Sequence, residues 1–195
     1  MNVGTGALIL TGTLAFGGGD KTISLGRYDD TPGLINRFDQ AFVDNSTANL
    51  TGISKDGRST WYLAGANTFT GTITLVEGTL RLGAAVTGAR RLNMNNTNGR
   101  GAILQLDNDA SFDQVGHTNA FTGLGNEIQL TGGHTFTFNG TQLGNNNSAG
   151  NSNYWNGNIS GNGSVIKNSN AAGDQVALMG FVSQVFPSNG LNSFT

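Results

Sequence analysis

The chain has 195 residues, of which only 11% are charged, with 10 basic and 12 acidic side chains. This weak and balanced charge supplies no basic surface, so we expect no nucleic-acid partner. The absence of cysteine excludes disulfides, thiolate metal sites and cysteine catalysis. With 36% hydrophobic residues and 31 glycines, the composition predicts an ordered chain with many turns.

Neither a membrane anchor nor a signal peptide is expected. The longest apolar runs, such as 7–10, are far too short for a membrane-spanning helix. Met1 is followed by neither a basic segment nor a long apolar segment. Any export signal is therefore expected outside this chain.

Short runs that alternate apolar and polar residues recur along the chain. They occupy 13–16, 21–25, 60–64, 72–76, 79–82, 91–94, 102–106, 127–130 and 134–138. This period of two, rich in β-branched and aromatic residues, predicts strands. Glycine and asparagine clusters separate the runs and supply turns. The spacing by itself leaves a sandwich, a barrel and a β-solenoid open.

The stretch 27–46 breaks this pattern and is the most charged part of the chain. Thr31 and Pro32 suit the start of a helix. Four apolar residues then fall on one helical face: Leu34, Ile35, Phe38 and Phe42. We expect a short helix or a loop excursion from a coil, which either covers an edge of the core or binds a partner.

A long internal repeat favours a solenoid. Residues 16–25 are similar to 130–138, although the two copies lie more than half the chain apart. Two further pairs follow in the same order: 49–57 with 157–164, and 61–65 with 176–180. A long repeat made of short strands is typical of a solenoid rather than a closed barrel. We therefore expect one all-β domain over 1–195.

The stretch AGANTFTGTITLVEGTLRLG (64–83) shows how such a coil would be built. Its alternation directs one set of side chains inward: Ile73, Leu75, Leu80 and Leu82. A second set faces water: Thr72, Thr74, Thr79 and Arg81. The corners fall at glycines: Gly71, Gly78 and Gly83. These residues predict a scaffold and carry almost no side chains suited to catalysis.

The same stretch resembles the autotransporter-associated β-strand repeat. The similarity is specific over 48–85, looser over 1–26 and 126–167, and absent over 27–46. Thr72 replaces a usual glycine of the repeat, and the second copy of the repeat that is expected after Met179 is missing. The resemblance implies a right-handed parallel β-helix of secreted bacterial surface proteins. It therefore implies an extracellular or cell-surface location.

The polar residues do not form a recognisable catalytic or metal-binding pattern. Asp107, Asn108 and Asp109 could hold a calcium ion or form an Asx-rich turn. Asp29 and Asp30 suit a solvated loop. His117 and His134 are the only histidines, and His134 is expected at a strand edge. We predict no catalytic residue, no metal, no cofactor and no enzyme activity.

Tyr154 and Trp155 are the candidate binding residues. They form an aromatic pair within a polar segment and could stack on a sugar ring or on a partner surface. Inward packing at a coil corner is the alternative. Asparagine clusters at 93–98 and 145–147 are expected at corners, where amides can stack between coils.

Three functions remain open. The first is a non-enzymatic extracellular structural or adhesive module, which could associate with itself through open solenoid ends and form fibres. The second is a module that binds a glycan or a host or cell-surface receptor through Tyr154 and Trp155 or through 27–46. The third is a polysaccharide-active enzyme, which would require a cluster of carboxylates on one outer sheet.

Overall fold

The computed structural model describes residues 6–14, 17–26, 33–94, 101–116, 126–143, 154–155, 158–167 and 177–178, some of them by backbone alone. The described residues are all-β and contain no helix. The strands are β1 (Ile9–Leu10), β2 (Lys21–Leu25), β3 (Ile35–Phe38), β4 (Thr51–Lys55), β5 (Thr60–Leu63), β6 (Ile73–Leu75), β7 (Gly78–Leu82), β8 (Val86–Met94), β9 (Ala102–Leu106), β10 (Ala110–Gly116), β11 (Glu127–Leu143), β12 (Tyr154–Trp155), β13 (Asn158–Lys167) and β14 (Ala177–Leu178).

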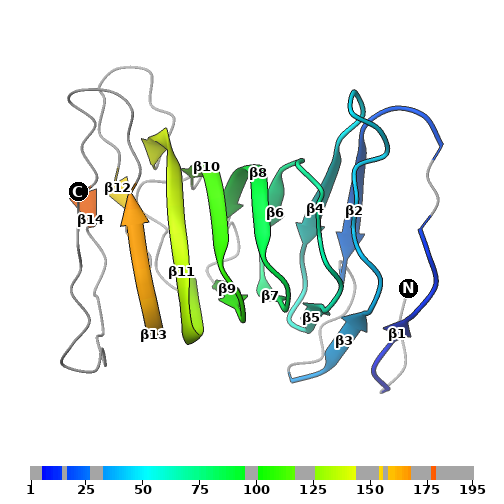
Figure 1. Cartoon of the computed structure of the whole chain (residues 1–195). Coiled ribbons are helices and arrows are strands. Elements are labelled where there is room, and N and C mark those ends of the chain that lie inside the picture. The colour runs from blue at the N-terminus through cyan, green and yellow to red at the C-terminus, as the bar shows by residue number, and fades with distance from the viewer. Residues whose placement is uncertain are drawn as a thin grey trace.

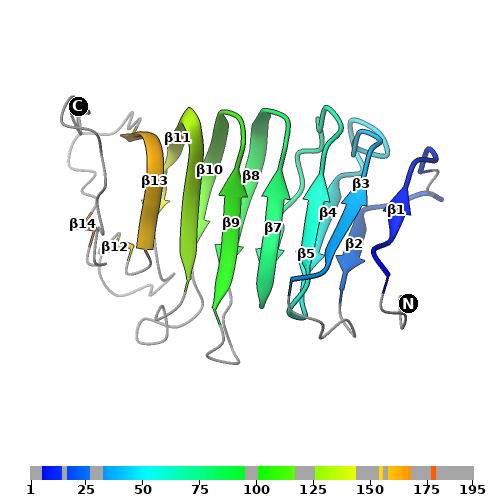
Figure 2. The same cartoon turned by 90° about the horizontal axis from the view of Figure 1, so that it is seen from below.

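The strands stack as successive coils of a β-solenoid-like fold. One ladder runs β1-β3-β5-β7-β9-β11, and the other runs β2-β4-β6-β8-β10-β11, with parallel pairing throughout both ladders. Figure 2 shows the odd-numbered strands in front of the even-numbered ones. The long strand β11 joins the two ladders because its first part pairs with β9 and its second part with β10. β13 pairs with β11 along both parts.

A narrow apolar core lies between the two ladders. Ile73, Leu75 and Leu80 are fully buried, and Leu82 is almost so, which confirms their predicted inward direction. Each inward residue lies beside another on the next coil: Leu63 pairs with Leu82, and Leu82 with Leu106. Burial of such a side chain stabilises the fold by about 2 kcal/mol. The aliphatic column therefore holds neighbouring coils together.

The structural repeat is a single coil, much shorter than the repeat expected from the sequence. Ile35 pairs with Thr60 and Thr60 with Thr79, which gives steps of 25 and 19 residues. The expected match of 49–57 with 157–164 is wrong in structural terms. The first segment lies in the even-numbered ladder at β4, whereas Asn158 to Gly161 pair with the first part of β11. Because the corners differ in length from coil to coil, the short repeat has no fixed period in the sequence.

The segment predicted to be a helix or an excursion contains a strand. Within the described part, 33–46, β3 pairs with β1 on one side and β5 on the other. Phe38 and Phe42 are buried with their ring centroids 4.4 Å apart, whereas Ile35 is exposed. The helix expectation is wrong here because strand pairing and burial of the two rings override the local pattern. Residues 27–32 lie outside the described residues.

Glycines allow the coils to approach closely. Gly78 has a φ of +71°, a conformation that favours glycine, as expected for a corner. At Gly71 and Gly83 the requirement is instead the lack of a side chain, because neighbouring atoms lie too close for a Cβ. A Cβ on Gly71 would lie 2.2 Å from the carbonyl oxygen of Thr51, and one on Gly83 would lie 2.5 Å from the Tyr62 hydroxyl oxygen.

Candidate functional site

The outer face of the odd-numbered strands carries a continuous chain of interacting side chains. Arg37 on β3 lies beside Tyr62 on β5, and Tyr62 lies beside Arg81 on β7. The guanidinium carbons of Arg37 and Arg81 lie 5.4 Å and 4.6 Å from the centre of the Tyr62 ring. Such cation–π contacts stabilise by about 0.5–1 kcal/mol at exposed sites. We call this set, with Asp107 and Thr131, the outer ladder.

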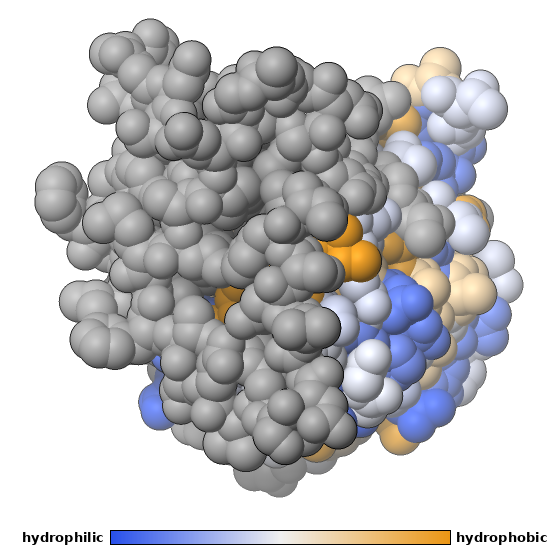
Figure 3. All heavy atoms as spheres, turned by 60° about the vertical axis from the view of Figure 1, so that its left-hand side comes forward, coloured by the Kyte–Doolittle hydropathy of each residue, from blue (hydrophilic) through white to orange (hydrophobic). Residues whose placement is uncertain are grey.

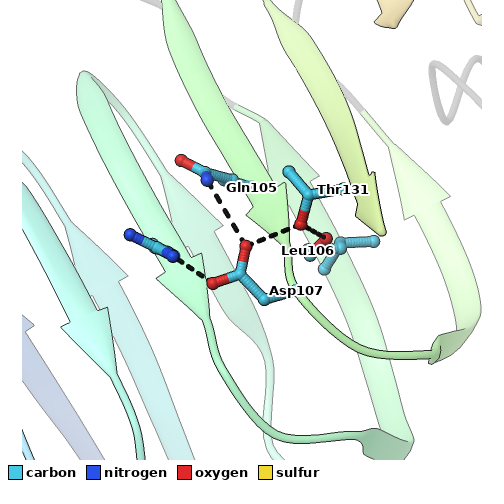
Figure 4. Close-up of polar contacts among 5 residues, drawn as sticks. Gln105, Leu106, Asp107 and Thr131 are labelled. Atoms are coloured by element: carbon cyan, nitrogen blue, oxygen red, sulfur yellow. Dashed lines mark hydrogen bonds and ion pairs between the residues drawn. The ribbon is translucent and has the colours of Figure 1, made fainter. Parts of the chain in front are cut away.

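The outer ladder continues across two further coils (Figure 4). Arg81 forms an ion pair with Asp107, whose side chain is only 16% exposed. The Thr131 hydroxyl lies 2.8 Å from Asp107 Oδ1 and 3.0 Å from the carbonyl oxygen of Leu106, so it can donate to either oxygen. Gln105 Nε2 donates to the same carboxylate oxygen. The outer ladder therefore connects five successive coils, from β3 to β11.

The positive charges of the two arginines in the outer ladder are neutralised by neighbouring aspartates. Arg37 is paired with Asp39 on its own strand end, and the hydrogen bond to Asp39 together with its charge raises the pKa of Arg37. Arg81 is paired with Asp107. Because both guanidinium groups already have carboxylate partners, an anionic ligand would have to compete with these aspartates. The two arginines also come from the strands on either side of Tyr62, so its ring is not a free platform for a sugar.

A buried lysine marks the corner after β4. Lys55 is fully buried and occupies an inward position between Leu25 and Leu75. Its Nζ donates to the carbonyl oxygens of Asp56 at 2.8 Å, Gly57 at 2.6 Å and Glu77 at 3.2 Å. An ammonium has three protons, and three acceptors satisfy them. Lys55 therefore ties its own corner to the corner of the next coil.

Buried amides and one carboxylate bracket other corners. Asn67 Oδ1 accepts from the Phe42 amide at 3.0 Å, and Asn126 connects the Ala102 amide with the carbonyl of Met94. Asp44 accepts from the backbone amides of Thr51 and Thr70 and from the Thr70 hydroxyl. Asparagine does bridge coils, but at other positions than predicted. Of the predicted clusters, Asn93 lies in β8, and 95–98 and 145–147 lie outside the described residues.

The acidic and histidine candidates serve the scaffold where they are described. Asp109 Oδ1 accepts from the Thr135 amide at 2.8 Å and lies 3.6 Å from His134 Nδ1. Asp107 belongs to the outer ladder, so both carboxylates bond to neighbouring coils. Over the described ranges no cluster of histidine and acidic residues could hold a metal ion. Asp29, Asp30 and His117 lie outside them.

The predicted binding pair lies apart from the main ladders. Tyr154 and Trp155 form β12, which pairs in parallel with β14 through Tyr154 with Ala177 and Trp155 with Leu178. In Figures 1 and 2, β12 and β14 lie beyond β13, on the side away from β11. The side chains of this pair lie outside the described residues, so stacking on a sugar stays a prediction.

The outer ladder and Lys55 were not identified from the sequence. A signal existed for Lys55, because the alternation of Ile53, Ser54 and Lys55 places the lysine inward. For the ladder, the steps from Arg37 to Tyr62 to Arg81 are 25 and 19 residues, so no fixed period indicates contact. Figure 3 brings the left-hand side of Figure 1 forward, and the coloured part of the surface in that view is mainly hydrophilic, with small separate apolar areas.

Comparisons with known proteins do not identify this chain. No protein family, no curated protein and no solved structure matches it. The described part of the chain contains no helix that is long and apolar enough to cross a membrane.

Proposed function

We propose that this chain is a non-enzymatic structural or adhesive module that acts outside a bacterial cell. In this proposal it is one domain over 1–195, wound as a right-handed parallel β-helix of the autotransporter passenger kind. The sequence resemblance over 48–85 supports the location and the handedness. The parallel coils support the general architecture.

The observation that carries this proposal is the use of acidic side chains as connectors. Asp20 accepts from the amide of Leu50, Asp44 from Thr70 and Asp109 from Thr135, each across to a neighbouring coil. Asp107 does the same through Arg81 and Thr131. A glycosidase needs two opposed carboxylates that are free to act on substrate. Carboxylates occupied by coil-to-coil bonds favour a scaffold.

The proposal is tested by the shape and the inertness of the purified chain. We expect negative-stain electron microscopy across a dilution series to show rods, which associate end to end at high concentration. We also expect incubation with a panel of polysaccharides to release no new reducing ends. Release of reducing ends or unsaturated products would contradict a non-enzymatic module. An Asp107→Asn variant would then show whether the activity uses the acidic segment 107–109.

A second candidate is recognition of a glycan or receptor through Tyr154 and Trp155. The occupied ring of Tyr62 favours this pair over the outer ladder as an aromatic platform. We expect Trp155→Ala to abolish binding of the protein to its ligand on a glycan array. Val43→Ala, a substitution at an exposed site, should leave this binding unchanged. Equal binding by both variants would remove Trp155 from this role.

A further inference from the structure

The corner after β4 contains the only aspartate of the sequence that is followed by glycine, Asp56-Gly57. The amide nitrogen of Gly57 donates to Oδ1 of Asp56 at 2.8 Å. The carboxyl carbon, Cγ, is therefore one covalent bond away from an atom that this nitrogen already contacts. Gly57 has a φ of +75° and no side chain, so no Cβ hinders the approach of its nitrogen to Cγ. The carboxyl group and the next amide are held together in a way that favours a reaction between them.

The ammonium group of Lys55 lies on the peptide group that would react. Its Nζ donates to the carbonyl oxygen of Asp56 at 2.8 Å and to that of Gly57 at 2.6 Å. The first of these oxygens belongs to the same amide as the Gly57 nitrogen. A positive charge on an amide oxygen draws electron density from the nitrogen, so it stabilises the nitrogen after loss of its proton. Because Lys55 is fully buried, water weakens this interaction little.

The rest of the corner is fixed in place but still reaches solvent. The amide of Asp56 donates to the carbonyl oxygen of Leu25 at 3.0 Å, and Lys55 also donates to the carbonyl oxygen of Glu77. Asp56 is only partly buried, and Arg58 is exposed. Water can therefore reach the carboxyl group, and the corner can extend outward at Arg58 by one backbone atom.

We propose that Asp56 converts spontaneously to isoaspartate through a cyclic imide with Gly57, and that Lys55 promotes this reaction. In the first step the Gly57 nitrogen loses its proton and bonds to Cγ of the protonated carboxyl group. That group releases hydroxide, which leaves with the proton as water. In the second step water adds to the α-carbonyl carbon of Asp56, and the bond from this carbon to the Gly57 nitrogen breaks. The nitrogen regains a proton, the backbone continues through Cγ, and the α carbon carries a carboxylate.

Lys55 also determines which bond of the imide breaks. Its Nζ lies beside the α-carbonyl oxygen, where negative charge develops when water attacks that carbon. Attack there gives isoaspartate, whereas attack at Cγ restores aspartate. The carboxylate of the product then replaces a neutral carbonyl as a partner of the ammonium, and charge-assisted hydrogen bonds are stronger than neutral ones. We therefore expect isoaspartate to be the main product in the folded protein.

Peptide mapping of the unaltered chain tests the proposal. The protein is incubated at mildly acidic pH, where more of the carboxyl group is protonated, in water enriched in the heavy oxygen isotope. Trypsin then releases the tripeptide 56–58, and chromatography against synthetic standards separates its aspartyl and isoaspartyl forms. The isoaspartyl form should carry one heavy oxygen atom, because water opens the imide. The folded chain should convert about tenfold faster than the chain unfolded in urea.

A second aspartate in the same sample is the internal control. Asp107 is followed by Asn108 instead of glycine and is paired with Arg81. It should not convert under the same conditions.

Two variants separate the role of Lys55 from that of the Asp-Gly pair. Lys55→Met should slow the conversion about tenfold or more, because it removes the charge from the reacting amide. Lys21→Met, at an exposed site, should leave the rate unchanged. Asp56→Asn keeps the size of the side chain and should also react faster in the folded chain than in urea, with release of ammonia. Circular dichroism checks that each variant keeps the β fold.

The possible outcomes are distinct. No isoaspartate at position 56, or conversion no faster in the folded chain than in urea, would overturn the proposal. Equal rates in Lys55→Met and Lys21→Met would overturn the role of Lys55. The proposed scaffold function does not depend on these results, because the reaction changes one corner and leaves the two ladders intact.

Discussion

The N-terminal coil, with β1 and β2, differs from the central coils, with β5 to β10, although both follow the same alternation. Leu63, Leu80 and Leu104 in the central coils are fully buried because a coil lies on each side of them. Leu10 and Ile23 in the N-terminal coil are only partly buried, and the described strands place a coil on one side of them. Inward direction alone therefore does not determine burial. In this fold each coil depends on two neighbours.

The largest effect is expected from truncating the core at matched positions. Leu80→Ala should lower the free energy of unfolding by about 4 kcal/mol, because the coils on either side would prevent collapse of the cavity. Leu10→Ala should cost about 1 kcal/mol, since its side chain is already partly in water. Chemical denaturation of dilute protein measures both. Equal losses would show that the N-terminal coil is packed as tightly as the central coils.

Close approach between coils gives the next effect. Gly71→Ala should destabilise by about 3 kcal/mol, because the new Cβ would lie 2.2 Å from the carbonyl oxygen of Thr51. Gly12→Ala should change stability little, because no atom lies within 4 Å of a Cβ there. Thermal unfolding of the two variants gives the comparison. A tolerated Gly71→Ala would mean that the central coils can separate to make room.

Substitution of one buried and one exposed lysine compares the coil of β4 with the N-terminal coil. Lys55→Met should cost about 2 kcal/mol, because it removes the buried donor from three carbonyls. Lys21→Met should be nearly neutral, since Lys21 donates to one carbonyl at an exposed site. Urea unfolding at neutral pH measures the difference. An unchanged midpoint for Lys55→Met would contradict the role of Lys55 as a tie between corners.

The smallest effect concerns the ion pairs of the outer ladder. A double-mutant cycle on Arg81 and Asp107 should give a coupling of about 1 kcal/mol, because the carboxylate is largely buried. The cycle on Arg37 and Asp39 should give a clearly smaller coupling, since both side chains are more exposed. Added salt should reduce the second coupling more than the first. A reversed order would place the stronger ion pair at β3.

Hydrogen exchange follows the comparison along the whole stack. Amides of β5, β7 and β9 should exchange only on global unfolding, because their strands pair on both sides. Amides of β2 that face outward should exchange fastest in dilute protein. Equal protection of the β2 amides and of the β7 amides would contradict this difference between the coils.

The sequence predicted the strands and the inward side chains of 72–82 correctly. Alternation is a local property, so it can be recognised without the partner strand. The same reasoning failed at 33–46, where Phe38 and Phe42 fit a helical face as well as they fit a buried strand and corner. There the neighbouring strands β1 and β5 decide the outcome.

The sequence by itself determined the strands of 72–82 and their inward and outward faces, through alternation and glycine corners, whereas the parallel arrangement was implied by the resemblance at 64–83 and is shown by the strand pairing. Only the tertiary structure decided which residues meet across coils: Arg37 with Tyr62, Tyr62 with Arg81, and Arg81 with Asp107. The physical reason is that each corner has its own length, so the register between coils depends on backbone pairing and core burial. Side-chain direction follows from local geometry, whereas side-chain partners depend on the number of residues in each coil.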